Sequence, residues 1–302
     1  MPSGKVIARQ ELAKTVVSFQ HILVATDFSQ EARSALDYAL AIARSFQSQV
    51  HLVHAIPTGL LQYVAPEGAE DVIRQARQFA GQEMQRLVND AGCSGKVQES
   101  ILSGAAVWPL LEEFIREHSI DLLVVGTHGR TGTKRQLLGP VAEEAFRLAA
   151  CPVLTVGTSK QQPAPQRNFR NVLLATNFKP QAEYATQFAY ALERELKSHM
   201  DVLHVVEDQR DLSVGGRDIV CEFMVTRMRK GMPLSCVGRC GPSFHVRFGD
   251  AGEQVVKFAG EEQSDLIVLG MRSGKDVPGM LPSAIAYKVA CQAECPVLTI
   301  RR

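Results

Sequence analysis

Glycines and basic residues gather between Gly126 and Gly139, in the stretch GTHGRTGTKRQLLG. The glycine spacing is G-x2-G-x9-G, counted from Gly126 through Gly129 to Gly139. Glycine lets a backbone approach a ligand closely because it carries no Cβ, and the side chains of Arg130 and Lys134 could neutralise an anion. The stretch therefore predicts a loop that holds a phosphate-bearing ligand. The alternative is an ordinary glycine-rich turn between a strand and a helix, with no ligand.

The segments on either side of this loop are those of a parallel α/β sheet. The apolar run Leu122–Val125 predicts a buried strand, Val141–Ala149 has the spacing of an amphipathic helix, and Pro152–Val156 predicts another strand. A loop that joins the carboxyl end of a strand to the amino end of a helix exposes unpaired N–H groups at the positive end of the helix dipole. An anion is therefore favoured at this position.

The residues before this stretch alternate between strands and helices in the same way. We expect strands at Phe19–Thr26, Val50–Ile56 and Lys96–Leu102, and helices at Glu31–Phe46, Asp71–Ala91 and Ala105–His118. Ser29 is placed to cap the first helix, and Pro57–Ala69 is expected to be a loop over the edge of the sheet. Asp27 directly follows the first strand. Because parallel strands end at one edge of their sheet, Asp27 and the glycine loop should lie close together.

The chain then repeats this plan. HILVATDF returns as NVLLATNF at Asn171–Phe178, DLLVVG returns as DLIVLG at Asp265–Gly270, and CPVLTV returns as CPVLTI at Cys295–Ile300. A polar stretch with two prolines, Thr158–Arg167, separates the copies. We therefore expect a lead-in over residues 1–18, a first domain over 19–157, a linker over 158–169 and a second domain over 170–302.

Composition narrows the possible functions. The chain has 302 residues, of which 45% are hydrophobic and 22% charged, as in ordinary soluble proteins with two domains. A net charge of +1 argues against a nucleic-acid partner that binds by bulk charge. Apolar runs are too short to cross a bilayer and no secretory signal is evident, so a cytoplasmic protein without a membrane partner is expected. The seven cysteines form no disulfide pattern, which favours reduced thiols.

The glycine spacing and the GTHGRTG loop, together with ATDFS, VHAI and CPVLTV, resemble the universal stress protein family, and the resemblance covers nearly the whole chain twice. It implies two α/β, Rossmann-like domains of the adenine nucleotide alpha hydrolase type, each a five-stranded parallel sheet of strand order 3-2-1-4-5 flanked by helices. It implies that ATP or a related adenine nucleotide, alone or with Mg²⁺, binds the first domain, and that the protein acts in stress response by regulated binding and not as an enzyme. It also implies pairing of the domains through their last strands and leaves a homodimer open.

The resemblance also selects the residues that should contact the nucleotide. Near the nucleoside it places Ala25, Asp27 and Ala55, and near the ribose and phosphates it places Gly126, His128, Gly129, Gly139, Pro140 and Val141. Thr26, beside Asp27, and Arg130, whose charge could neutralise a phosphate, are the other candidate site residues. One departure is Pro140, since the family has Ser or Thr there and proline offers neither an N–H nor a hydroxyl.

The second half departs further from the family pattern. Ser273 and Ser283 align with Gly129 and Gly139, and Asn177 aligns with Asp27. A Cβ at both glycine positions should obstruct the approach of a phosphate. We therefore expect one nucleotide per chain, held by the first half.

Two other functions remain open at this point. A slow ATPase or nucleotidyl transferase would need a carboxylate that holds a metal, for which Asp27 is the obvious candidate. A ligand-free interaction module is the other, with Pro140 as its support. No catalytic residue and no metal ligand is assigned, because Cys236-x3-Cys240 followed by His245 is a weak zinc pattern. His54 and His204 occupy equivalent strand positions, which favours a packing role for both.

Overall fold

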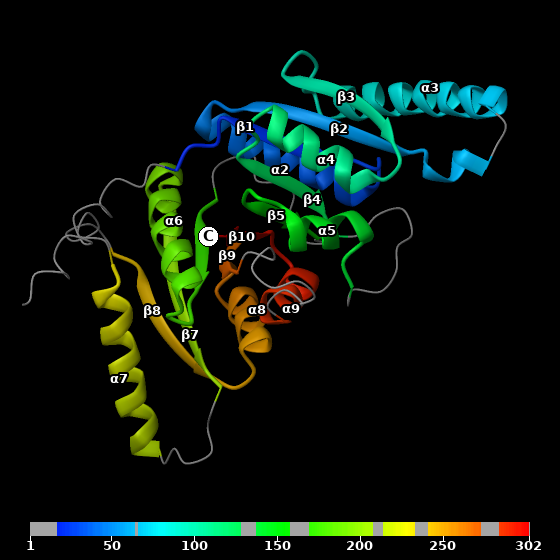
Figure 1. The fold of residues 1–302 in the computed structure, drawn as a ribbon. Coiled ribbons are helices and arrows are strands. Elements are labelled where there is room, and N and C mark those ends of the chain that lie inside the picture. The colour runs from blue at the N-terminus through cyan, green and yellow to red at the C-terminus, as the bar shows by residue number, and fades with distance from the viewer. Residues whose placement is uncertain are drawn as a thin grey trace, which may run out of the picture. The chain divides into compact units, whose positions relative to one another are not determined.

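The computed structural model describes residues 17–63, 66–127, 137–157, 169–207, 214–232, 241–272 and 284–301 (Figure 1). The chain divides into two compact units, which separate between Arg167 and Asn168. No helix in these described ranges is long and apolar enough to cross a membrane.

The first half is a parallel sheet with helices between its strands. Its strands are β1 (His21–Ala25), β2 (Gln49–Pro57), β3 (Val97–Gly104), β4 (Leu122–Gly126) and β5 (Val153–Val156). Its helices are α2 (Gln30–Phe46), the 3-10 turn η2 (Gly59–Tyr63), α3 (Pro66–Asp90), α4 (Val107–Glu117) and α5 (Pro140–Leu148). All neighbouring strands are parallel, in the order β3-β2-β1-β4-β5. The predicted order 3-2-1-4-5 is therefore confirmed for this half.

The second half repeats the architecture. Its strands are β6 (Asn171–Ala175), β7 (His199–Val206), β8 (Ser243–Phe248), β9 (Leu266–Met271) and β10 (Val297–Arg301), and its helices are α6 (Pro180–Leu196), α7 (Val214–Lys230), α8 (Ala251–Glu261) and α9 (Ala284–Gln292). The strands are again parallel, in the order β8-β7-β6-β9-β10. Each half thus has the same topology, and the duplication seen in the sequence is a duplication of the fold.

The central strands form the core of each half. Ile22, Leu23 and Val24 on β1 are all 0% exposed, and so are Val172, Leu173 and Leu174 on β6. Successive residues of a strand point to opposite faces, so burial of three in a row means that both faces of the sheet are covered. This explains why these strands read as continuous apolar runs in the sequence.

A half-buried aspartate holds the start of the first strand in each half. The Asp121 carboxylate accepts the N–H groups of Gln20 (2.6 Å) and His21 (3.2 Å), and the Asp265 carboxylate accepts those of Arg170 (2.8 Å) and Asn171 (3.0 Å). Burial raises the pKa of both carboxyl groups. These bonds tie β1 to β4 and β6 to β9 at the amino ends of the strands, and so help set which residues emerge at the opposite edge.

The segment after β2 differs from its prediction. The expected loop over Pro57–Ala69 is wrong, because β2 extends to Pro57, η2 follows, and α3 already begins at Pro66. Proline suits the first position of a helix, since its missing N–H would have no partner there. The N–H of Thr58 donates to the Gly104 carbonyl at 2.7 Å, which ties this segment to the end of β3.

Candidate functional site

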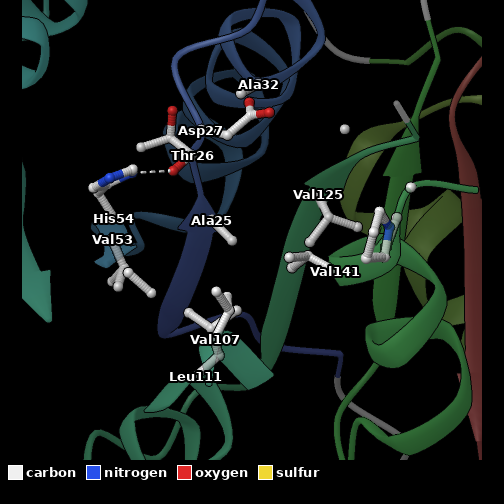
Figure 2. A pocket seen from close by; sticks show the side chains of 15 residues that line it. Ala25, Thr26, Asp27, Ala32, Val53, His54, Val107, Leu111, Val125 and Val141 are labelled. Carbon is white, nitrogen blue, oxygen red and sulfur yellow. Dashed lines mark hydrogen bonds between the residues drawn. The ribbon is translucent and has the colours of Figure 1, made fainter. Parts of the chain in front are cut away.

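A cavity of about 150 Å³ lies at the carboxyl ends of β1, β2 and β4 in the first half (Figure 2). Ligands of doubly wound sheets bind at this edge, where the strand order reverses on either side of the first strand. Here β1 lies between β2 and β4, so the cavity is at that point of the sheet. The first turns of α4 and α5 complete its wall.

Most residues predicted from the family motif line this one cavity. They are Ala25, Thr26, Asp27, Ala55, Gly126, Gly139, Pro140 and Val141. The other three, His128, Gly129 and Arg130, lie outside the described residues. The structure therefore brings together every predicted site residue that it describes.

The cavity wall includes further residues that the sequence reading did not assign to it. These are Ala32, Val53, His54, Val107, Leu111, Val125 and Ala142. The apolar ones lie at strand ends and in helical first turns, where a lining residue and a core residue look alike in sequence. The signal that could have found Val107 and Leu111 is their i, i+4 spacing in the helix that follows the third strand. His54 was interpreted as a packing residue, although it directly precedes the predicted site residue Ala55.

The cavity has an apolar wall and a polar edge. Figure 2 shows the side chains of Val107, Leu111, Val125 and Val141 on one side and the oxygen atoms of Asp27 on another. Such a surface suits a ligand with a flat apolar part and a polar part.

The turn that carries Asp27 is held by its own hydrogen bonds. The N–H of Phe28 donates to Thr26 Oγ1 at 3.0 Å, and the N–H of Ser29 donates to Asp27 Oδ1 at 3.0 Å. Ser29 Oγ in turn accepts the N–H of Ala32 at 3.2 Å, so Ser29 caps α2 and this prediction is confirmed. The chain passes from β1 to α2 in a tight turn that leaves Asp27 beside the cavity.

The first turn of α5 presents backbone donors to the cavity. Gly139 precedes the helix, Pro140 is its first residue, and no side chain caps this end. The N–H of Gly139 is already donated to the Thr127 carbonyl at 2.7 Å, and proline has none. The N–H groups of Val141 and Ala142, which both line the cavity, therefore form the positive end of the helix that an anion would meet.

Gly126 has a packing role that the spacing did not reveal. A Cβ built on Gly126 would lie 2.9 Å from the Cβ of Glu31 and 3.0 Å from the Glu31 carbonyl carbon, in the first turn of α2. A Cβ on its counterpart Gly270 would lie 2.3 Å from the carbonyl oxygen of Gln181 in α6. The first glycine of the motif thus lets a helix pack closely on the strand in both halves, whether or not a ligand is present.

The second half has the same turn with a different side chain at its centre. Asn177 stands where the first half has Asp27, and its Oδ1 accepts the N–H of Lys179 at 3.1 Å. The amide carries no charge. The Arg227 guanidinium carbon lies 4.2 Å from the centre of the Phe178 ring, so a cation from α7 covers this turn.

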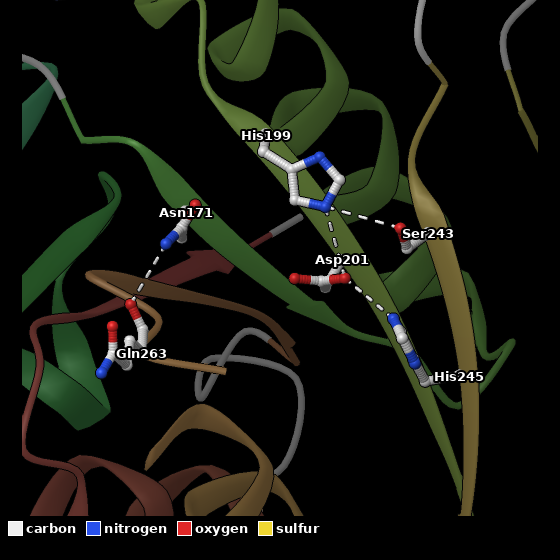
Figure 3. Close-up of polar contacts among 6 residues, drawn as sticks. All are labelled: Asn171, His199, Asp201, Ser243, His245 and Gln263. Carbon is white, nitrogen blue, oxygen red and sulfur yellow. Dashed lines mark hydrogen bonds and ion pairs between the residues drawn. The ribbon is translucent and has the colours of Figure 1, made fainter. Parts of the chain in front are cut away.

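A Ser, His and Asp cluster in the second half does not have the geometry of a catalytic triad (Figure 3). Ser243 Oγ lies 3.5 Å from His199 Nε2, but that same nitrogen faces Asp201 Oδ1 at 3.6 Å. A triad needs the serine and the aspartate on different ring nitrogens. His245 Nε2 meets Asp201 Oδ1 at 2.8 Å. The cluster lies at the starts of β7 and β8, the edge opposite to the strand ends.

The cysteines that the structure describes are thiols and not members of a disulfide, namely Cys93, Cys151, Cys221, Cys291 and Cys295. Cys151 and Cys295 are buried, and burial raises the pKa of Cys295 to about 12. Among the described residues, no group of three or more His, Cys, Asp or Glu side chains suits a metal ion. Cys236 and Cys240 lie outside these residues.

Comparison with known proteins identifies the family. The model of the universal stress protein family matches residues 18–157 and again residues 168–301. A universal stress protein of Methanocaldococcus jannaschii is 30% identical over 148 residues, which are 48% of this chain and 85% of that protein. A universal stress protein of Mycolicibacterium smegmatis is 25% identical over 290 residues, which are 93% of this chain and 96% of that protein.

A solved structure shows the same fold over most of the chain. The crystal structure of a universal stress protein from Archaeoglobus fulgidus matches with a TM-score of 0.66 at 17% identity, and the match covers 93% of this chain and 98% of that one. The chain therefore belongs to the universal stress protein family and contains the family's domain twice.

Proposed function

We propose that the first half binds ATP or a related adenine nucleotide, and that the protein acts in stress response through regulated binding. The observation that carries this proposal is the convergence of the motif residues. Residues from the end of β1, the end of β2, the end of β4 and the start of α5 line one cavity, although they are far apart in the sequence.

The cavity wall supplies a partner for each part of a nucleotide. The apolar side chains from α4, β4 and α5 suit the faces of an adenine ring, whose burial is favourable. The Asp27 carboxylate accepts hydrogen bonds and therefore suits the hydroxyl groups of a ribose. The amino end of α5 favours the negative charge of phosphates. The sequence adds Arg130 and Lys134 in the same loop.

We propose binding without turnover as the mode of action. Asp27 is the one acidic residue among the described residues that line the cavity. Phosphoryl transfer usually depends on metal ions held by several ligands and on a group that positions the nucleophile. We expect ATP incubated with the protein and Mg²⁺ to remain intact over hours. Steady release of ADP or AMP that is lost in Asp27→Asn would contradict this mode and favour the slow enzyme.

The direct test is to denature the purified protein and identify any released small molecule by mass spectrometry. Titration calorimetry of the emptied protein with ATP, ADP and AMP, and with GTP as a control, then measures affinity and preference. We expect an adenine nucleotide to bind and Asp27→Asn to weaken it. Absence of heat with every nucleotide, and absence of a released one, would favour a ligand-free interaction module.

A further inference from the structure

We propose that His54 is a positioning residue of the first-half site, which holds the turn after β1 in the conformation that places Asp27 at the cavity. This inference rests on the proposed nucleotide binding and deepens it. It concerns a side chain that the resemblance does not place at the nucleotide and that the sequence analysis interpreted as a packing residue.

The first contact is a hydrogen bond to the backbone of the turn. His54 Nδ1 lies 2.8 Å from the carbonyl oxygen of Thr26 (Figure 2). A carbonyl oxygen can only accept, so Nδ1 carries the proton. This carbonyl belongs to the peptide unit that joins Thr26 to Asp27, so the bond fixes the orientation of the backbone from which the Asp27 side chain extends. The backbone of Thr26 makes a second hydrogen bond to β2, because its N–H donates to the Val53 carbonyl at 2.9 Å.

The second contact supports a strained residue in the same turn. Phe28 has a φ of 65°, a left-handed conformation that is unfavourable for a bulky side chain. Its ring lies against the His54 ring, with 4.4 Å between the ring centres and 30° between the planes. Strained backbone persists only where surrounding contacts hold it. His54 supplies two such contacts, one to the residue before Asp27 and one to the residue after it.

These contacts act at the site because the residues involved form its wall. Thr26, Asp27 and His54 all line the cavity. Without the imidazole, the Thr26 carbonyl would lose its side-chain donor and the turn could relax toward a less strained backbone. The Asp27 carboxylate would then lose its fixed position relative to β2 and β4.

The second half contains the same arrangement and so supplies a matched control. His204 Nδ1 lies 2.8 Å from the Thr176 carbonyl oxygen, Phe178 has a φ of 59°, and the two rings are 4.5 Å apart. The residue between them is Asn177 in place of the aspartate. A variant of His204 should therefore reproduce any purely structural cost of losing the imidazole without touching the nucleotide site.

The experiment compares two substitutions at His54 with one at His204. His54→Phe keeps an aromatic ring against Phe28 but removes the donor. His54→Asn places an amide N–H close to where Nδ1–H lies and keeps the hydrogen bond. Adenine nucleotide affinity is measured by titration calorimetry well below the melting temperature, and melting temperature is recorded separately.

We expect His54→Phe to weaken nucleotide binding by about tenfold or more, since an unmade buried hydrogen bond leaves the turn free to move. His54→Asn should restore most of the affinity. His204→Phe should lower the melting temperature to a similar extent but leave the affinity unchanged. If His54→Phe does not fold, His54→Gln takes its place in the experiment. The glutamine amide lies nearer the position of Nε2 than of Nδ1, so this variant should bind the nucleotide weakly where His54→Asn binds it well.

A double-mutant cycle with Asp27→Asn separates positioning from direct contact. If His54 acts through Asp27, His54→Phe should cost little further affinity once Asp27 is replaced. Additive losses would show that His54 contacts the nucleotide itself and would overturn the inference, as would unchanged affinity in His54→Phe or no rescue by Asn. Failure of the unmodified protein to bind any adenine nucleotide would instead overturn the proposed function, and this inference with it.

Discussion

Pro140 is the residue at which the first half of this chain departs from the family signature. It is the first residue of α5 and lines the cavity, where Ser or Thr would offer an N–H and a hydroxyl. A hydrogen bond to a charged group contributes about 1.5–3 kcal/mol, and 1.4 kcal/mol corresponds to about tenfold in affinity. We expect Pro140→Ser to tighten nucleotide binding by about tenfold, as measured by calorimetry.

Pro140→Ala is the matched control, because it restores the N–H without a hydroxyl. A gain in affinity in Pro140→Ala that is smaller than in Pro140→Ser would show that the N–H and the hydroxyl both contribute. If neither variant binds more tightly than the unmodified protein, the start of α5 does not contact the phosphates.

The residues of the site were predicted in two ways, from chemistry that is visible in the sequence and, for apolar residues such as Ala25 and Ala55, from the resemblance to the family alone. Asp27 and Gly139 were predicted because a carboxylate after a strand and a spaced glycine are unusual. Val107 and Leu111 were missed because their apolar side chains satisfy a core and a cavity wall equally well. His54 was missed because its partner is a backbone carbonyl, which every residue possesses and no sequence pattern reveals.

At the scale of secondary elements, Gly126 and Gly270 control how closely a helix approaches the sheet. A Cβ at either position would meet helix backbone within 3.0 Å, so the helix would have to move. We expect Gly126→Ala and Gly270→Ala to destabilise their halves by about 1–3 kcal/mol, with the larger loss at Gly270.

Urea unfolding measures both effects on stability. The single tryptophan of the chain, Trp108, is buried in the first half, and its fluorescence reports on that half. Circular dichroism follows both halves, so a transition that it shows without a change in fluorescence belongs to the second. Gly81→Ala in α3 is the control, because no atom lies within 4 Å of its Cβ position and alanine is the better helix former. Equal stability of Gly126→Ala and Gly81→Ala would refute this role of the glycine.

A histidine cluster where β2 begins should make the first half sensitive to acid. His51 is 3% exposed, its Nε2 lies 3.4 Å from His21 Nδ1, and its ring is 5.4 Å from that of His118. Burial, with the charges of His118 and His21, lowers the pKa of His51 from its ordinary value of 6.5. The folded state therefore binds fewer protons than the unfolded state, so stability is full above that value and falls as the pH drops through it.

We expect the free energy of unfolding, followed by Trp108 fluorescence, to decrease between about pH 7.5 and about pH 5.5. The decrease should be smaller in His51→Gln, which cannot bind the proton. An unchanged pH dependence in that variant would show that His51 does not cause the effect. His204, whose pKa is lowered by burial and by Arg227, should give the second half a similar dependence.

The elements themselves followed closely from the sequence, with one exception. Central strands such as β1 and β4 were predicted within about a residue or two, because a strand covered on both faces must be apolar throughout. The start of α3 was predicted five residues late, at Asp71 in place of Pro66. The sequence there contains Pro66 and Gly68, which are typical of loops. Only tertiary context decides whether such a segment is a loop or the start of a helix.

At the scale of the whole molecule, the two halves should differ in ligand binding despite their common fold. We expect one nucleotide per chain. Gly139→Asp should abolish binding, because it brings a negative charge to the predicted phosphate position. Ser283→Asp, at the aligned position of the second half, is the control and should bind as the unmodified protein does. Two equal sites in calorimetry would show that both halves bind. Loss of binding in Ser283→Asp alone would show that the site lies in the second half.

The final strands of the two halves should hold the chain together. Val153–Val156 and Val297–Ile300 are apolar runs, and an apolar strand at the edge of a sheet favours pairing. We expect them to pair with each other within one chain. A protease site placed in the polar stretch 158–167 tests this by gel filtration after cleavage. The fragments should elute together in the absence of denaturant, and separate elution would refute the pairing.

The packing role of Gly126 and Gly270 has a consequence for how such a protein evolves. The glycine that the fold requires is present in both copies, while the second copy has serine at the positions of Gly129 and Gly139. If the first half binds a nucleotide as proposed, we expect substitutions at those two positions to weaken binding without disturbing the contact between strand and helix. After duplication, selection on folding and selection on binding therefore act on different glycines. One copy can then lose its ligand and acquire another function while its sheet remains folded.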